Sequence, residues 1–533
     1  MELKESASFM RRLKKYLPLI CALAGITFVF LFFAFQKSGM FIDEIHTYGL
    51  SNSYYQPFVK DIKDGDMIDK VYTRQELINF TQINGDEGFD FGSVYYNQTM
   101  DVHPPLYYWI VNIISSIFRD GFSMWPMLIV NLIFFLGTLI LLYKITDRLL
   151  KSKKIALISV LLYGLSSIGM STVLMIRMYV LLTFLTILLV YLSILYIEKG
   201  KLVYAVPIMI TIYAGLMTQY YFVFYAFFMC ISVIIYLIMK KKYKQTAVFG
   251  ISAIMGVILM VVSFPSVINH LFADKLVSGG NALENLKDIS QYAERIIQYA
   301  DGTARRTLAI IVIGIASFLV LIFMHNKIRE FKGTISIKPL LFIIPIVLTV
   351  TIIAIISPVY TTRYIYNVMP MVVFTVCYII YVLVSISVKH HLILDTMIVL
   401  AIIFSFIGLK YPPEYLCKEQ REYNKICKAY SENPCIYIND NYNTAITRDL
   451  LQLIYFDDFF VTNNTSSDKL HEYIETHKNN NELVVYVDID EFWASGYDSK
   501  EIMDEMIRYT DFKKYTLLYK TGSEETYLMT KAD

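Results

Sequence analysis

The sequence predicts a polytopic α-helical membrane protein with about 11 transmembrane helices and a C-terminal soluble α/β domain. Hydrophobic residues make up 56% of the 533 residues, and the mean hydropathy is +0.48. This hydrophobic fraction is higher than that of a typical soluble globular chain. Apolar runs of membrane-spanning length recur up to about residue 409, whereas the chain after that point alternates short apolar strands with polar and acidic stretches.

The apolar runs place the spans at roughly residues 17–36, 123–143, 155–172, 178–197, 202–218, 220–239, 246–264, 307–325, 339–357, 364–386 and 392–409. Basic residues gather in the cytoplasmic loops of membrane proteins. This arrangement puts the following basic segments in the cytoplasm: Arg11-Arg12 with Lys14-Lys15, Lys144–Lys154, Lys199 with Lys201, Lys240–Lys244 and Lys327–Lys338. The first span has no small-residue cleavage site, so we expect a retained helix with a cytoplasmic N-terminus.

The apolar segment Leu106–Phe118 is predicted to lie in the membrane interface instead of crossing the bilayer. A helix of this length is about 20 Å long, whereas the hydrocarbon core is about 30 Å thick. Counting it as a twelfth span would also move most basic segments to the outside. We therefore expect an interfacial helix with Tyr107, Tyr108 and Trp109 at headgroup level.

This topology divides the chain into a transmembrane domain, residues 1–409, and an extracytoplasmic α/β domain, residues 410–533. The other regions predicted outside are loop 37–122, loop 265–306 and the short turns near 172–177 and 358–363. The tail is large enough for its own core. Its predicted strands include Cys435–Ile438, Leu483–Val487 and a hairpin of Tyr515–Tyr519 with Thr526–Met529 around Thr521-Gly522-Ser523.

The cysteines give little evidence for a metal site. Three lie in apolar runs, and Cys417, Cys427 and Cys435 lie close together in the tail without paired metal-ligand spacing. Their odd number allows one disulfide with a spare thiol. Loop 37–104 contains eleven Asp and Glu residues against five Lys and Arg, which is compatible with a divalent metal but is also the composition of an ordinary soluble surface.

The distinctive polar residues follow or precede the outer ends of the predicted spans, and almost no charge lies within the spans. They are Asp43-Glu44, His103 before Pro104-Pro105, Arg177-Met178-Tyr179, Gln219-Tyr220-Tyr221 and Arg363-Tyr364. Five sites that are distant in sequence are therefore predicted to meet at one depth on one face, which indicates an active site. Each site alone has an ordinary explanation: acids beside a membrane are usually solvated, His103 could cap a turn, and Arg177 and Arg363 could be snorkelling anchors.

Taken together, these motifs resemble the GT-C glycosyltransferases, and in particular bacterial relatives of the protein O-mannosyltransferases (glycosyltransferase family 39) and of the lipid A aminoarabinose transferases. The resemblance covers roughly residues 17–380. It rests on the acid pair, on His-Pro-Pro-Leu-Tyr at 103–107, on Arg-Met-Tyr at 177–179 and on Arg363-Tyr364 followed by Pro370. The chain departs from the pattern at Met175, where relatives often have Glu, and at Gln219, where they often have His.

The resemblance implies transfer of a sugar from a polyprenyl-phosphate carrier to an acceptor on a protein, lipid or cell-envelope glycan. Asp43 is implied as the general base with Glu44 in support, because a base must activate the acceptor. Arg177, Arg363 and His103 are implied at the donor phosphate, since a guanidinium fork matches phosphate oxygens. The implied supporting residues are Tyr179, Tyr220 and Tyr364. The sequence identifies no certain cofactor, and a divalent metal is compatible with the site.

Two other function classes remain open at this stage. A transporter or flippase of lipid-linked glycans would carry charge deep in the bundle and internal symmetry. A non-catalytic envelope-binding protein would depend on its tail and tolerate loss of Asp43 or Arg363. The net charge of +2 gives no reason to expect a nucleic-acid partner. The partners expected are the lipid-linked donor, an extracytoplasmic acceptor and the bilayer, and the expected location is the cell membrane.

Overall fold

The computed structural model describes residues 2–59, 68–119, 121–272, 289–323, 336, 338–357, 360–386, 390–408, 411–439, 443–489 and 498–531. The chain forms two compact units. The first consists of Met1–Phe35, Val102–Tyr107 and Met124–Tyr415, and the second of Gln36–Asp101, Tyr108–Ser123 and Leu416–Asp533. The predicted domain boundary near residue 410 stays a prediction. The loop after the first helix belongs to the same compact unit as the tail.

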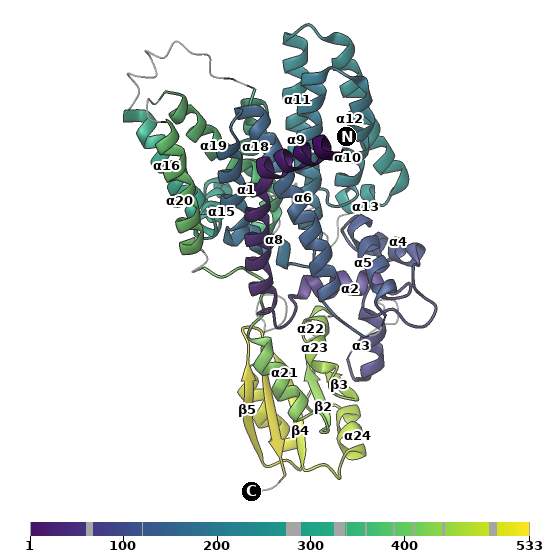
Figure 1. The fold of residues 1–533 in the computed structure, drawn as a ribbon. Coiled ribbons are helices and arrows are strands. Elements are labelled where there is room, and N and C mark those ends of the chain that lie inside the picture. Colours follow the sequence, from purple (N-terminus) through teal and green to yellow (C-terminus); the bar gives the residue numbers. More distant parts are fainter. Residues whose placement is uncertain are drawn as a thin grey trace. The chain divides into compact units, whose positions relative to one another are not determined.

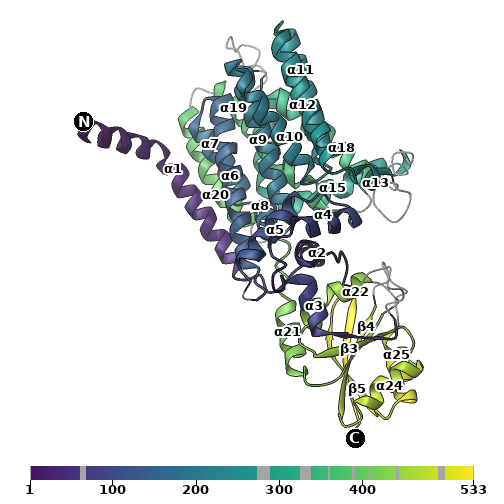
Figure 2. The same ribbon diagram turned by 90° about the vertical axis from the view of Figure 1, so that its right-hand side faces the viewer.

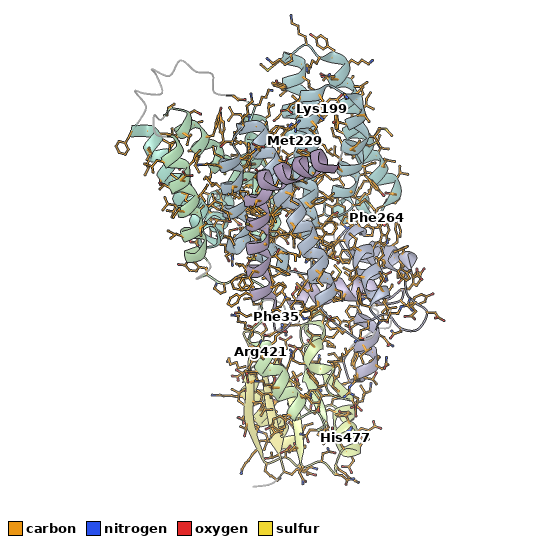
Figure 3. All side chains as sticks on the ribbon, in the orientation of Figure 1. Phe35, Lys199, Met229, Phe264, Arg421 and His477 are labelled. Carbon is orange, nitrogen blue, oxygen red and sulfur yellow. The ribbon has the colours of Figure 1, made fainter. Side chains whose placement is uncertain are left out.

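The first unit is helical throughout its described part (Figure 1). Its elements are α1 (Glu2–Ala34), α6 (Trp125–Leu150), α7 (Lys153–Gly164), α8 (Ser167–Leu174), α9 (Tyr179–Lys199), η2 (Leu202–Tyr204), α10 (Ala205–Leu216), α11 (Phe222–Met239), α12 (Tyr243–Ser263), α13 (Val267–Phe272), η3 (Ile289–Gln291), α15 (Tyr292–Arg306), α16 (Leu308–Phe323), α18 (Leu340–Ile356), η4 (Thr362–Val368), α19 (Met369–Ser385) and α20 (His390–Gly408). Lys199 ends α9, and Met229 on α11 is fully buried (Figure 3).

Six helices among the described residues are long and apolar enough to cross a membrane, which makes the chain a multi-pass membrane protein. They are Tyr16–Ala34, Trp125–Leu150, Tyr179–Lys199, Phe222–Met239, Tyr243–Ser263 and Thr362–Ser385. The remaining predicted spans fall on a bent helix pair, Lys153–Gly164 with Ser167–Leu174, or on the shorter apolar helices Leu202–Leu216, Ile310–Phe323, Leu340–Ile356 and Leu394–Ile403. The count of eleven spans therefore stays a prediction.

The predicted span 155–172 is broken rather than continuous. Helices α7 and α8 meet at an angle of 62°. The Ser166 hydroxyl accepts a hydrogen bond from the amide of Gly169 at 3.0 Å and thereby caps α8. An N-terminal serine cap satisfies an amide that has no partner within its own helix. The break therefore begins a new helix inside the protein, where every residue of α8 is buried.

Lys154 on α7 forms an ion pair with Asp395 on α20 at 2.5 Å. The predicted spans 155–172 and 392–409 begin next to these residues, and the ion pair shows that the two helix ends lie at the same level. Both side chains are substantially exposed, at 44% and 59%. Exposed pairs contribute only about 0–1 kcal/mol, so the pair reports the alignment of the helices more than it stabilises them.

The second unit contains a mixed sheet covered by helices. Its elements are α2 (Ile42–Asn52), β1 (Lys70–Thr73), α3 (Arg74–Thr81), α4 (Phe91–Met100), α21 (Gln420–Ala429), β2 (Cys435–Ile438), α22 (Asn443–Arg448), α23 (Leu450–Leu453), β3 (Asp458–Thr462), α24 (Asp468–Thr476), β4 (Glu482–Asp488), α25 (Ser499–Tyr509), β5 (Lys514–Lys520) and β6 (Glu524–Thr530). Most of α5 (Leu106–Ile117) also belongs to this unit. The two predicted strands and the predicted hairpin are confirmed.

The sheet has the strand order β1-β3-β2-β4-β6-β5, and β2, β3 and β4 run parallel. Strand β1 comes from the first loop and pairs antiparallel with β3, with Lys70 opposite Val461 and Thr73 opposite Asp458. The sequence alone predicts no strand in this segment. It ends in a capping box, in which Thr73 and Glu76 satisfy each other's backbone amides, so that α3 begins where the strand stops.

The two faces of the sheet have separate helical layers, which Figure 2 shows with α24 and α25 on one side and α21 on the other. Side chains alternate between the faces of a strand. Ile436 and Ile438 accordingly join a core with α24 and α25. Tyr437, between them, faces the opposite layer, where its hydroxyl donates to Asp449 at 2.6 Å.

The three tail cysteines are free thiols, so the disulfide that their number allowed does not form in this structure. Cys427 and Cys435 are buried in the apolar layers, with exposed fractions of 2% and 0%. The sulfur of Cys427 lies 3.0 Å from the hydroxyl of Tyr486. Burial raises the pKa of the Cys427 thiol to about 12, so the thiol stays protonated and unreactive at neutral pH.

Candidate active site

Asp43 and Glu44 lie in the first turn of α2 and differ in their surroundings. The Asp43 side chain is half-buried, whereas Glu44 is fully buried. The Glu44 carboxylate accepts a hydrogen bond from the amide of Phe41 at 2.8 Å and forms an ion pair with Lys37 at 2.8 Å. Glu44 thus holds the start of the helix, and Asp43 next to it keeps partial access to solvent.

The other end of α2 is held by buried amide side chains from α4 and α5. Asn97 donates to the carbonyl of Ser53 at 2.9 Å, and Asn112 donates to the carbonyl of Ser51 at 2.8 Å. The last carbonyls of a helix lack partners within the helix. Asn97 and Asn112 supply the missing hydrogen-bond donors inside the protein, so α2 is fixed at both ends.

The His103 segment belongs to the first unit. His103 is half-buried, and Pro104 and Pro105 after it are buried. The amide of Leu106 donates to the carbonyl of Met217 at 3.0 Å, which ties this segment to the end of α10. The Pro-Pro pair restricts the backbone before the helix begins. The segment therefore holds His103 at a defined place at the start of α5.

Helix α5 forms as predicted, but two of its aromatic residues lie in the protein interior. Tyr107 and Tyr108 have no exposed surface. The Tyr107 hydroxyl donates to the amide oxygen of Asn131 on α6 at 2.9 Å. A buried tyrosine hydroxyl usually needs such a partner. The sequence alone does not distinguish tyrosines at headgroup level from tyrosines buried against a neighbouring helix, because the residue is common in both settings.

Asn131 connects the His103 segment with the Arg177 segment. Its amide nitrogen donates to the carbonyl of Met175 at 2.8 Å and to that of Val173 at 3.2 Å. Sequence reasoning missed Asn131, although a single Asn within an apolar span was a usable signal. The side chain is fully buried, so its hydrogen bonds fix the two segments relative to each other.

Arg177 lies at the tight junction between α8 and α9. Its amide donates to the carbonyl of Met175, only two residues back, at 2.9 Å. The residue is 5% exposed. Met175 itself is fully buried at the position where relatives often carry Glu. The junction therefore presents a guanidinium group within an apolar bundle and no carboxylate at position 175.

Arg363 lies within η4, and Tyr179, at the start of α9, contacts the same element. The ring of Tyr179 meets that of Tyr366 edge to face at 6.1 Å. The guanidinium carbon of Arg363 lies 5.8 Å from the centre of the Tyr364 ring, within the range of a cation–π contact. The Tyr364 ring in turn contacts Tyr221 at 5.1 Å.

Tyr220 contacts a histidine that the sequence analysis did not consider. The Tyr220 hydroxyl lies 2.8 Å from Nδ1 of His270 on α13. The His270 ring also packs edge to face on Phe264, which is labelled in Figure 3. Two helices, α11 and α12, separate His270 from Tyr220 in the sequence, so no local sequence pattern links them. It supplies an imidazole beside the turn in which Gln219 occupies the position that is often His in relatives.

Within the first unit, the hydrogen bonds of Asn131 link the His103 segment to the Arg177 segment. Tyr179 on α9 contacts η4, the element that contains Arg363. Asp43 and Glu44 belong to the second unit, and their predicted convergence with the arginines stays a prediction. No group of three or more His, Cys, Asp or Glu side chains suited to a metal ion occurs among the residues that the structure describes. The side chains placed here therefore do not form a ready metal site.

Comparison with solved structures identifies the fold. ArnT from Cupriavidus metallidurans bound to undecaprenyl phosphate is similar with a TM-score of 0.53 and 9% sequence identity, over 96% of this chain and 97% of that chain. The apo state of the same enzyme gives a TM-score of 0.50 with the same identity and coverage. The chain thus shares the fold of ArnT, as the predicted GT-C-like fold requires.

A narrower likeness concerns the segment that contains His103 and Arg177. Residues 102–268 match the family model described as dolichyl-phosphate-mannose-protein mannosyltransferase. The match covers less than half of the chain. No curated protein matches.

Proposed function

We propose that this protein is a membrane glycosyltransferase that moves a sugar from a polyprenyl-phosphate carrier to an acceptor outside the cytoplasm. The GT-C fold and the family match over residues 102–268 support the reaction class. The structure of ArnT bound to undecaprenyl phosphate supports a lipid phosphate as the carrier. The acceptor class is a hydroxyl or amine of a protein, lipid or envelope glycan.

The observation that carries this proposal is the burial of Arg177 between α8 and α9. The residue is 5% exposed, and α8 and most of α9 around it are buried and apolar. Ionisable residues are costly in such surroundings and usually mark a functional site. A guanidinium stays charged when buried and binds phosphate oxygens through two parallel hydrogen bonds. Arg177 therefore fits an anionic substrate better than a purely structural role.

The reaction moves charge from the acceptor to the phosphate. Asp43 takes the proton of the acceptor hydroxyl or amine, the acceptor atom attacks the anomeric carbon, and the bond from that carbon to the phosphate oxygen breaks. The donor phosphate is a diester with one negative charge, whereas the released polyprenyl phosphate is a monoester with up to two. Arg177 and Arg363 stabilise the additional charge as it develops, which lowers the barrier.

Glu44 has a positioning role in this proposal. Its carboxylate is engaged by Lys37 and by the Phe41 amide, so it orients the first turn of α2 and leaves Asp43 to accept the proton. His103, at the start of α5, orients its segment or contacts the phosphate. Tyr179, Tyr220 and Tyr364 support the outer helix ends.

The localisation follows from the partition of basic loops. We place the N-terminus in the cytoplasm and the site and tail outside, where a polyprenyl carrier presents its sugar after crossing the membrane. The isoprenoid chain requires only apolar grooves between helices, and the bilayer supplies the rest of its surroundings.

The direct test uses the purified full-length protein in nanodiscs with a polyprenyl-phosphate-sugar donor and envelope extract as the acceptor. Mass spectrometry of the extract should show one added sugar, and free polyprenyl phosphate should accumulate in equal amount. Envelope glycans from a deletion strain should lack that sugar. Transport of the intact lipid-linked sugar between leaflets without transfer would contradict the proposal.

A further inference from the structure

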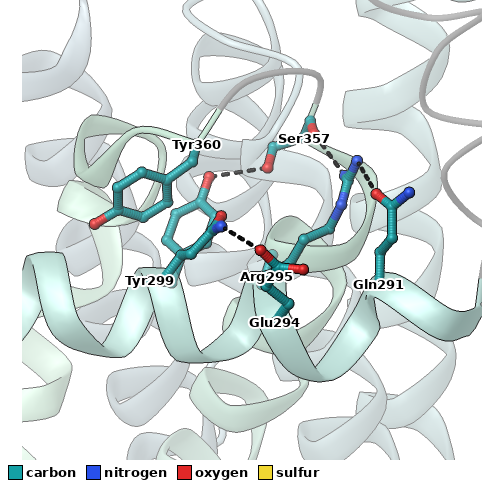
Figure 4. A pocket seen from close by; sticks show the side chains of 8 residues that line it. Gln291, Glu294, Arg295, Tyr299, Ser357 and Tyr360 are labelled. Carbon is teal, nitrogen blue, oxygen red and sulfur yellow. Dashed lines mark hydrogen bonds between the residues drawn. The ribbon is translucent and has the colours of Figure 1, made fainter.

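Helix α15 is fixed by its side chains to the end of α18. Arg295 donates to the carbonyls of Ile355 and Ser357 at 3.0 and 3.1 Å, and the Tyr299 hydroxyl donates to the Ser357 hydroxyl at 3.0 Å (Figure 4). A small hollow of about 160 Å³ lies along this contact. The carbonyls at the end of a helix lack partners within it, so Arg295 supplies donors that α18 itself cannot. Helix α15 is thereby a fixed support for the residues at its other end.

The other end of α15 meets a carboxylate from the segment after α20. Arg306, the last residue of α15, forms an ion pair with Oε1 of Glu414. The Arg306 guanidinium also donates to the carbonyl of Gly302 at 2.9 Å and to the Thr362 hydroxyl at 3.5 Å. Thr362 begins η4, in which Arg363 is the next residue. The charge of Glu414 is therefore held beside the element that contains Arg363.

The element that contains Arg363 needs support from other segments. Residues Thr362–Val368 form a 3₁₀ helix of seven residues. Runs longer than about four residues are uncommon, because the hydrogen bonds of a 3₁₀ helix have poorer geometry than those of an α-helix. Thr361, which precedes η4, does not cap it through its side chain. The position of Arg363 therefore depends on the contacts that η4 makes with its surroundings.

Glu414 provides two such contacts through one oxygen. Its Oε2 accepts a hydrogen bond from the Tyr366 hydroxyl at 2.7 Å and one from the Thr362 hydroxyl at 3.4 Å. These two donors lie on either side of Arg363 in the sequence, and Tyr366 is fully buried. Both carboxylate oxygens are thus engaged, one by α15 and one by η4. Hydrogen bonds to an ionised acceptor are roughly twice as strong as neutral ones, so Glu414 holds η4 on both sides of Arg363.

The backbone around Glu414 is bound to α8. The Glu414 amide donates to the hydroxyl of Ser171 at 2.9 Å, and the Ser167 hydroxyl donates to the carbonyl of Pro412 at 3.3 Å. Pro412 and Pro413 restrict the backbone immediately before Glu414. The segment is therefore both stiff and attached to α8.

The contacts of Glu414 connect the surroundings of both arginines that are proposed to bind the donor phosphate. Helix α8 ends at Leu174, shortly before Arg177, and η4 contains Arg363. We propose that Glu414 is a positioning residue for the phosphate: its amide and its carboxylate fix the spacing between the end of α8 and η4, and hence between the two guanidinium groups. The inference rests on the proposed function, because it concerns the phosphate site of that reaction.

A binding experiment tests the positioning role without requiring transfer. The probes are farnesyl phosphate and farnesol, which share an isoprenoid chain and differ in the phosphate. Their binding to the full-length protein in nanodiscs is titrated, and the signal of empty nanodiscs is subtracted. Glu414→Ala should weaken binding of farnesyl phosphate about tenfold, the order expected when a charged hydrogen-bond partner is lost, and should leave binding of farnesol unchanged. No binding of farnesyl phosphate by the wild type, an unchanged affinity in the variant, or an equal loss for both probes would overturn the proposal.

Two further variants separate positioning from a general loss of structure. Both side chains of the Arg306–Glu414 pair are 26% exposed, so its loss should not prevent folding. Glu414→Gln keeps an acceptor for Tyr366 without the charge and should lose less affinity than Glu414→Ala. Glu294→Ala is the matched control, because Glu294 is exposed on α15 and accepts from Gln298 of the same helix at 3.2 Å. Equal losses of phosphate affinity in Glu294→Ala and Glu414→Ala would contradict the assignment.

The hydrogen bond from Tyr366 provides a milder variant. Tyr366→Phe removes the hydroxyl and keeps the ring, so it should weaken binding of farnesyl phosphate less than Glu414→Ala does. Because Tyr366 acts through Glu414, the double variant should bind no more weakly than Glu414→Ala alone. Additive losses in the double variant would contradict the proposed connection.

Transfer kinetics give a third readout. The charge on the phosphate increases as its bond to the sugar breaks, so misplaced arginines should lower turnover more than they weaken donor binding. Glu414→Ala should therefore lower kcat and raise the KM of the donor, while the KM of the acceptor stays at the wild-type value. A change confined to the KM of the acceptor would contradict the positioning role.

These readouts separate this inference from the proposed function. A wild type that binds farnesyl phosphate but transfers no sugar, together with weaker binding by Glu414→Ala, would support the inference and contradict the glycosyltransferase activity. Transfer by the wild type, together with unchanged phosphate binding and turnover in Glu414→Ala, would do the reverse.

Discussion

At the residue scale, the acid pair contains two carboxylates with different roles. Glu44 is buried and bound by two donors, whereas Asp43 is half-buried. The sequence predicted the pair but not this division, because Lys37 was counted as the first residue of a loop. A lysine seven residues before Glu44 has no helical or strand periodicity that would connect the two.

Asp43→Asn keeps the size of the side chain but removes the base. Turnover should fall by roughly 10²–10⁴-fold, the usual effect of losing a general base. Binding of the donor should be unchanged, because the phosphate contacts and the lipid groove are intact. Initial rates and donor binding in nanodiscs measure the two quantities. Normal turnover by this variant would exclude Asp43 as the base.

Lys37→Met leaves the Glu44 carboxylate buried without its cation. Both side chains are 0% exposed, and breaking one side of a buried pair costs about 3–5 kcal/mol. Denaturant unfolding of the protein in detergent should show this loss. Adding Glu44→Gln should recover much of it, because the amide oxygen still accepts from Phe41 and carries no charge.

The exposed pair of Lys425 with Glu422 provides the comparison. Its side chains are 66% and 65% exposed, so Lys425→Met should change the free energy of unfolding by no more than about 1 kcal/mol. Equal losses for Lys37→Met and Lys425→Met would show that the buried pair does not stabilise α2.

At the element scale, the sequence predicted those features that depend on neighbouring residues. The hairpin of β5 and β6 was predicted because its turn residues and strand residues are adjacent. The break between α7 and α8 was missed, although Gly164 and Ser166 are the residues expected at such a boundary. Hydropathy alone averages over these two positions and reports one continuous span.

The first residue of β6 makes the stability of the tail depend on pH. Burial raises the pKa of Glu524 to about 8. A carboxyl group in the unfolded chain loses its proton near pH 4.5, so between about pH 5 and pH 8 the folded state binds more protons than the unfolded state. Stability is therefore full below about pH 4.5 and is lost as the pH rises toward 8.

Glu525, next to it, does not oppose this effect in that range. Burial alone would raise the pKa of Glu525. Hydrogen bonds from Lys520, Ser499 and Tyr527 have a larger and opposite effect, and they bring the pKa to about 2. We expect the melting temperature of the tail to fall between pH 5.5 and pH 8, and Glu524→Gln to flatten the slope. The exposed Glu422→Gln variant should keep the slope of the wild type. A melting temperature that rises with pH would contradict the assignment.

At the scale of the whole molecule, the predicted topology determines on which side of the membrane each proposed site residue lies. With the N-terminus inside, eleven spans place the C-terminus outside. Reporter fusions after Lys410 should report an extracytoplasmic end. Cysteines at positions 151 and 242 should be protected from impermeant reagents in intact cells. A reporter that is active only in the cytoplasm would move the proposed site to the wrong side of the membrane.

Features that depend on residues far apart in the sequence could not be predicted from it. Asn131, His270 and strand β1 each act through partners that lie tens to hundreds of positions away. Their composition is ordinary for the segments in which they lie. Only the folded chain identifies their partners, whereas the superfamily could be predicted because its motifs are short and contiguous.

The pairing of β1 with β3 has a consequence for biosynthesis. Lys70 lies opposite Val461, so the strand leaves the ribosome almost four hundred residues before its partner. At about 5–20 residues per second, this interval is on the order of 20–80 s. During that time the spans must be inserted while Tyr72, buried in the finished sheet, still lacks the strand beside it. A segment that is translated late therefore completes one that is translated early, and a chain released before β3 would carry an open strand edge to chaperones and proteases.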